Sequence, residues 1–154
     1  MTNLPTSLSE AAVSGDPSAV LAAALVHFGC QAGTVHLLQD GALKLVAHSG
    51  IPPAVVQIVS SVPIGKGIAG LAAERREPIT ICNLQTDTSG QARPAARNTG
   101  MEGSIAVPML VRGELRGVLG VAKSTAHDWT PQETAVLSAL AERLGERVPV
   151  NTAL

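Results

Sequence analysis

Two apolar runs near the carboxyl end constrain the fold more than any other feature of the sequence. The segment from Ser104 to Lys123 has the pattern of a hairpin whose turn is Gly113-Glu114. Strands that are apolar on both faces are normally covered on both sides. We therefore predict that this hairpin is central in a sheet between two packed layers. Pairing around that turn puts Ile105, Val107, Met109, Val111, Val118 and Ala122 on one face, and Ala106, Pro108, Leu110, Leu119 and Val121 on the other.

Helix signals lie on either side of the sheet-forming part of the chain. Asp16-Pro17 is typical of a helix start, and that helix is expected to run to Phe28. The sequence Thr130-Pro131-Gln132-Glu133 has capping-box spacing, so a helix is expected from there to about Arg147, ended by Pro149. We expect residues 1–16 to be a lead-in, residues 17–148 one domain and residues 149–154 a C-terminal tail.

A second hairpin is expected around Asp40-Gly41, because Asp-Gly between apolar runs favours a tight turn. Its two-residue turn places Leu38 opposite Leu43 and His36 opposite Leu45. Short helices from Pro53 to about Ser60 and over residues 71–76, with a short strand over residues 78–82, complete the order. This order predicts an α+β domain with an antiparallel sheet. One face of the first hairpin is expected to carry Thr34, His36, Leu38, Leu43, Leu45 and Ala47.

The composition excludes several functions. The only aromatic residues are Phe28 and Trp129, so the chain has almost no rings on which to stack bases. The formal net charge is −1, which offers no basic field for nucleic acid or an anionic membrane surface. The start of the chain lacks a signal-peptide pattern, and the longest apolar run, residues 19–26, is far too short to span a bilayer. We expect a cytoplasmic protein without a nucleic-acid or membrane partner.

The sequence shows no catalytic constellation, and no metal or cofactor is expected. Cys30 and Cys82 lie far apart and have no zinc-ligand spacing. Cys30 is interpreted as a small core residue, whereas Cys82 borders the long polar segment 83–103 and is the better candidate for a reactive thiol. A segment of that length inside a compact domain is typical of a lid or binding loop. Residues 65–70 read G-x-G-x-x-G, which we interpret as a tight turn into a helix because no βαβ unit surrounds it.

Three segments together resemble the GAF domain family. They are residues 63–79, with the glycine segment followed by Glu77-Pro78-Ile79, the last hairpin from Gly103, and the helix after Thr130. The resemblance covers about residues 17–147. It implies a six-stranded antiparallel sheet, with the N- and C-terminal helices on one face and a small-molecule pocket under loops and short helices on the other. It also implies a sensory or dimerising role, with homodimers formed through the terminal helices.

Departures from the family pattern narrow the function. The signature of the cyclic-nucleotide subset is missing, neither cysteine has the adjacent histidine of the bilin-binding subset, and residues 83–111 hold none of the cysteines of free methionine-(R)-sulfoxide reductases. The family's common Asp after the middle strand is replaced here by Asn83. We therefore expect a non-enzymatic regulatory domain that acts in trans and binds a small, fairly apolar ligand or a signalling protein. The alternatives are a thiol-dependent reductase of the sulfoxide reductase type and a ligand-free dimerisation module. The candidate ligand-binding residues are His36, Cys82, Asn83, Arg97, Met101, Ser104 and Ala106.

Overall fold

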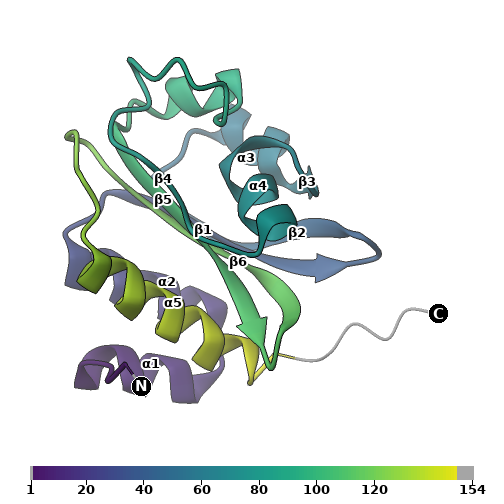
Figure 1. Cartoon of the computed structure of the whole chain (residues 1–154), viewed down its shortest axis with the longest axis vertical. Coiled ribbons are helices and arrows are strands. Elements are labelled where there is room, and N and C mark those ends of the chain that lie inside the picture. Colours follow the sequence, from purple (N-terminus) through teal and green to yellow (C-terminus); the bar gives the residue numbers. More distant parts are fainter. Residues whose placement is uncertain (1, 149–154) are drawn as a thin grey trace.

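Six strands form one antiparallel sheet in the computed structural model, which describes residues 2–148. Their order across the sheet is β3-β2-β1-β6-β5-β4 (Figure 1). The predicted α+β class and six-stranded sheet are confirmed. The tail expected over residues 149–154, including Pro149, lies outside the described residues. The strands are β1 (Ala32–Gln39), β2 (Ala42–Ser49), β3 (Ser61–Pro63), β4 (Ile79–Ile81), β5 (Gly103–Val111) and β6 (Glu114–Lys123).

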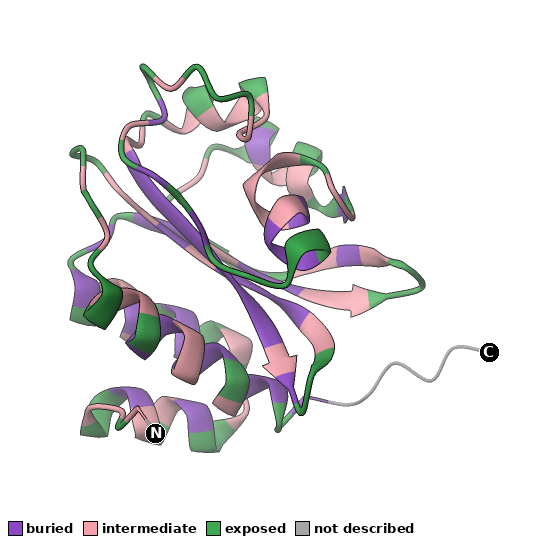
Figure 2. Ribbon diagram, in the orientation of Figure 1, coloured by how far each residue is buried: buried purple, intermediate pink, exposed green. Residues whose placement is uncertain are grey.

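Two helices, α2 (Pro17–Phe28) and α5 (Pro131–Gly145), cover one face of this sheet, and α1 (Thr6–Ser14) packs against both of them from the far side (Figure 1). The expected helix starts are present. Asp16 accepts a hydrogen bond from the Ser18 amide at 3.1 Å, and Thr130 and Glu133 form a complete capping box. Leu8 of α1 is fully buried, so the lead-in contributes to the core beneath these helices (Figure 2). No helix among residues 2–148 is long and apolar enough to cross a membrane.

The other face carries shorter elements: α3 (Pro53–Val59), α4 (Gly67–Arg75) and the 3-10 helix η1 (Pro94–Thr99). α4 begins four residues before the start at Leu71 expected from the sequence. A smaller apolar cluster under α4 includes Leu43, Val62, Ala72 and Val118. The sheet is therefore covered on both sides, as the apolar hairpin predicts.

The register of the first hairpin agrees with the prediction only near its turn. Leu38 pairs with Leu43 and His36 with Leu45, as expected. A bulge between Val35 and His36 then places Val35 opposite Ala47. A bulge adds one residue to one strand, which reverses the faces beyond it. Ala47 therefore belongs to the core under α2 and α5, and its expected place beside His36 is wrong.

The faces predicted for β6 are also wrong. The turn is Arg112-Gly113, with φ of 50° and 79°, one residue earlier than expected. Together with a bulge after Met109, it pairs Met109 with Gly117. A shift of one residue exchanges the two faces of a strand. Leu119 and Val121 consequently pack under the long helices, and Val118 faces α4.

Candidate functional site

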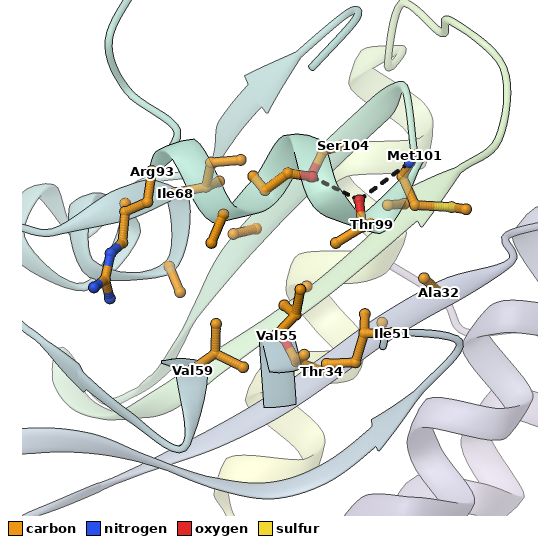
Figure 3. A pocket seen from close by; sticks show the side chains of 18 of the residues that line it. Ala32, Thr34, Ile51, Val55, Val59, Ile68, Arg93, Thr99, Met101 and Ser104 are labelled. Atoms are coloured by element: carbon orange, nitrogen blue, oxygen red, sulfur yellow. Dashed lines mark hydrogen bonds between the residues drawn. The ribbon is translucent and has the colours of Figure 1, made fainter. Parts of the chain in front are cut away.

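A cavity of about 160 Å³ lies between the sheet and the short elements on its second face. Strands β1, β5 and β6 form its floor, and α3, the start of α4 and the loop that contains η1 cover it (Figure 3). An apolar cavity of about 150 Å³ is enough to hold a benzene-sized molecule. The cavity therefore has room for one small ligand. Its aliphatic wall includes Ile51, Val55, Val59, Ile68 and Met101.

Four of the seven candidate residues line this cavity: His36, Met101, Ser104 and Ala106. The two strand residues Ser104 and Ala106 share one face of β5 and form part of the floor, whereas Met101 precedes that strand. The alternation of β5 is sufficient to place both floor residues, because side chains two apart point to the same face.

The other three candidates, Cys82, Asn83 and Arg97, do not line the cavity. Arg97 is exposed and donates to the Asp87 carbonyl oxygen at 2.9 Å, which turns its guanidinium into the loop. Cys82 is exposed beyond the end of β4. Arg97 lies on the 3-10 helix, whose position depends on tertiary contacts that sequence spacing does not reveal.

Asn83 organises the loop rather than the cavity wall. Its side-chain oxygen accepts from the Gln85 amide at 2.9 Å. The side-chain amide of Gln85 in turn donates to the carbonyl oxygens of Arg97 and Met101, at 3.1 and 2.8 Å. These bonds tie the start of segment 83–103 to the C-terminal end of η1. The long polar segment is thus an ordered cover, held over the cavity by its own hydrogen bonds.

His36 is the most buried polar side chain of the site, at 2 % exposure. Its Nε2 lies 2.8 Å from the Val59 carbonyl oxygen, so Nε2 carries the proton and donates it. Burial lowers the pKa of His36, against the opposing effect of this hydrogen bond. The imidazole is therefore neutral near pH 7, and Nδ1 is a buried acceptor without a partner in the described part of the chain. Such a group costs free energy unless a donor reaches it.

Arg93 and Lys66 are cavity residues that the candidate set omitted. Arg93 reaches the cavity because Gly67, at φ +69°, has no side chain. A Cβ there would lie 2.9 Å from Cγ and Cδ of Arg93. Gly70 likewise leaves room for the Pro63 carbonyl oxygen, so the glycine segment forms the tight turn that its sequence indicates. The glycine segment, residues 65–70, is the feature of the sequence that points to this wall of the cavity.

Neither thiol is activated. Burial raises the pKa of Cys30 to about 11, and Lys123 opposes this only in part. A hydrogen bond with Asp128 is the main cause that raises the pKa of Cys82. Nucleophilic cysteines need the thiolate form near neutral pH. Among residues 2–148, no three His, Cys, Asp or Glu side chains gather as they would around a metal ion.

The sequence model of the GAF domain family matches residues 18–146. The chain belongs to this family. No protein of curated function matches the sequence.

Solved structures resemble the fold of this GAF domain at low identity. The GAF domain of a phosphoenolpyruvate-protein phosphotransferase from Coxiella burnetii is 22% identical, with 92% of this chain and 89% of that chain covered and a TM-score of 0.76. The corresponding Acinetobacter domain is 18% identical, with coverage of 96% and 94% and the same TM-score. The free methionine-R-sulfoxide reductase of Neisseria meningitidis, in complex with its substrate, is 16% identical, with coverage of 96% and 92% and a TM-score of 0.71. These similarities show the fold alone.

Proposed function

We propose that this GAF domain is a non-enzymatic sensory module that binds one small, mainly apolar molecule between its sheet and the η1 loop. The observation that supports this most directly is the cavity, which combines a mainly aliphatic wall with a buried His36 Nδ1 that has no hydrogen-bond partner within residues 2–148. Small-molecule sites are typically apolar hollows with a few polar groups that fix orientation. Because η1 forms part of the cover, a bound molecule would stabilise the loop that a signalling partner can contact.

The test is native mass spectrometry of the purified protein, followed by calorimetric titration with what is released. We expect a bound species that Ala96→Phe excludes, because Ala96 lies on η1 and lines the cavity. Ala135→Phe, at an exposed position of α5, is the matched control and should bind as the wild type does. Equal binding by Ala96→Phe would place the ligand elsewhere and contradict the proposal.

A thiol-dependent reductase is the alternative, and it is favoured by the fold shared with sulfoxide reductases. Two observations count against it here: the exposed Cys82 lies outside the cavity, and its pKa is raised rather than lowered. We expect no reduction of free methionine-(R)-sulfoxide in the presence of dithiothreitol. Turnover that disappears in Cys82→Ser would establish the alternative instead.

We further propose that the module pairs with a second copy through its terminal helices. The supporting observation is the outer surface of α2, where Val26 is 84% exposed and Ala22 is also exposed. α2 contains no Lys, Arg, Asp or Glu. A solvated helix normally carries charges on its outer face, so this surface is suited to contact with another apolar surface.

A further inference from the structure

The polar atoms that face the cavity are unevenly distributed. Val59 and Arg93 lie at the same end of the cavity, opposite Thr99 and Met101 (Figure 3). His36 is hydrogen-bonded to the carbonyl oxygen of Val59 and so belongs to that end as well. The rest of the wall is mainly aliphatic, and its polar side chains are the neutral hydroxyl groups of Thr34, Thr99 and Ser104. Arg93 and His36 therefore make one end of the cavity more polar than the other.

The charge at the polar end is positive. Arg93 and Lys66 line the cavity, whereas no Asp or Glu of the described residues does. Neither cation forms an ion pair within residues 2–148, where the ion pairs are Arg116–Glu114 and His127–Glu133. The Nη1 nitrogen of Arg93 is buried and has no hydrogen-bond partner in the same range. A buried cationic donor of this kind is costly unless an anion accepts from it.

The backbone of α4 adds to this positive end. Gly67, Ile68 and Ala69, in its first turn, line the cavity, and no side chain in the described part of the chain caps this helix. The first N–H groups of a helix have no partner inside it and carry a partial positive charge. His36 supplies the complementary feature, because its side chain is only 2% exposed and its Nδ1 is an acceptor without a hydrogen-bond partner within residues 2–148. The site is therefore suited to a small apolar ligand that carries, at one end, an anionic acceptor and a neutral hydrogen-bond donor.

We propose that the ligand is a small aliphatic carboxylate that carries a hydroxyl group close to the carboxylate. Its carboxylate accepts from Arg93 and the first turn of α4, its hydroxyl donates to Nδ1 of His36, and its aliphatic part fills the end lined by Ile51, Val55 and Met101. A hydroxyl is the suitable donor because an ammonium group would be repelled by Arg93 and Lys66. This inference rests on the proposed function and adds the chemical class of the ligand.

The test is calorimetric titration at low ionic strength with four molecules that share one branched chain: 2-hydroxy-4-methylpentanoate, 4-methylpentanoate, 4-methylpentanamide and 4-methylpentan-1-ol. We expect the hydroxy acid to bind best, the plain acid next, and the two neutral molecules at least about tenfold more weakly than the hydroxy acid, because a hydrogen bond to a charged group is lost. Arg93→Met should remove the preference for the acids and leave the affinity of the alcohol unchanged. Arg112→Met, at the exposed β5–β6 turn, is the matched control and should behave as the wild type.

The outcomes separate this inference from the proposed function. If the neutral molecules bind as well as the acids, or if Arg93→Met keeps the preference, the carboxylate assignment is overturned while the binding function stands. If the plain acid equals the hydroxy acid, the role of His36 Nδ1 is overturned. If none of the four binds, and native mass spectrometry also shows an empty protein, both proposals fail.

Discussion

Two glycines of β6, Gly117 and Gly120, provide a sharp test of the sheet register and of the cavity. They lie three residues apart, so they face opposite sides of the strand. Gly120 pairs with Thr34 on one side and Ala106 on the other, and all three belong to the cavity floor. A Cβ at Gly120 would lie 3.4 Å from Thr34 Oγ1 and 3.6 Å from the Ile105 carbonyl oxygen, which is ordinary contact. At Gly117 the same atom would overlap the His36 carbonyl oxygen.

Gly120→Ala should therefore stabilise the protein. A strand glycine costs about 0.5–1 kcal/mol relative to alanine, because it loses more conformational freedom on folding. For a chain of this length the gain corresponds to an increase in Tm of roughly 1–4 °C. The added methyl group also enters the cavity, so ligand affinity should fall while stability rises. Gly117→Ala must displace backbone and should lower Tm or prevent folding.

Thermal and urea unfolding of both variants beside the wild type would measure these effects. A destabilised Gly120→Ala would show that no space exists above the floor of the cavity. A Gly117→Ala variant as stable as the wild type would refute the pairing of β1 with β6. The two outcomes are independent, because one tests the cavity and the other the register.

Four further predictions have defined outcomes. Thr130→Ala removes the side-chain acceptor of the capping box and should cost about 1 kcal/mol of unfolding free energy, measured in urea, whereas Thr130→Ser should cost much less. The free energy of unfolding should fall as the pH drops below about 6.5, because burial lowers the pKa of His36 and the unfolded chain takes up the proton first. The free energy should change by at most about 1.4 kcal/mol per pH unit, and His36→Phe should flatten this dependence. Glu133 affects stability over a separate pH range. Burial alone would raise its pKa, but hydrogen bonds from Thr130 and His127 lower it, so the stability that Glu133 contributes is lost only as the pH falls below about 4.5. Val26→Glu should shift the protein from dimer to monomer in sedimentation measurements. Val46→Glu changes another exposed valine, on β2, and should leave the dimer intact. A wild-type protein that is monomeric at all concentrations would contradict the pairing of copies.

The elements that the sequence predicts well are those encoded by short-range chemistry. The Asp16 cap and the capping box at Thr130 each involve residues within three positions, and both helices begin where these patterns place them. The Asp40-Gly41 turn also fixes the nearest pairs of its hairpin. By contrast, bulges after Val35 and Met109 change the register without any local signal. Side-chain alternation carried across them consequently assigns the wrong face to Ala47 and to the residues of β6.

The candidate site follows the same division. Ser104 and Ala106 are placed by strand alternation, and His36 by a hairpin register that holds on its side of the bulge. Cys82, Asn83 and Arg97 were chosen for their chemistry next to a long polar segment, but hydrogen bonds from Gln85 and Arg97 fold that segment back on itself. The arginine that reaches the cavity is Arg93. Its position depends on the space left by Gly67, a contact between segments 26 residues apart that spacing alone does not predict.

The scarcity of aromatic residues determines how the site can discriminate between ligands. Phe28 and Trp129 lie on the helix side of the sheet, with their ring centroids 6.5 Å apart, so no Phe, Tyr or Trp of the described chain lines the cavity. Stacking on a flat ring therefore contributes nothing, and the aliphatic wall distinguishes tails only by volume, at about 0.8 kcal/mol or fourfold per buried methylene. Loss of a hydrogen bond to a charged group costs about 1.5–3 kcal/mol, which is roughly 10- to 150-fold in affinity. Selectivity should accordingly reside in the groups around Arg93 and His36, and ligands that differ by one methylene in the tail should compete closely, whereas those that differ in the head group should not.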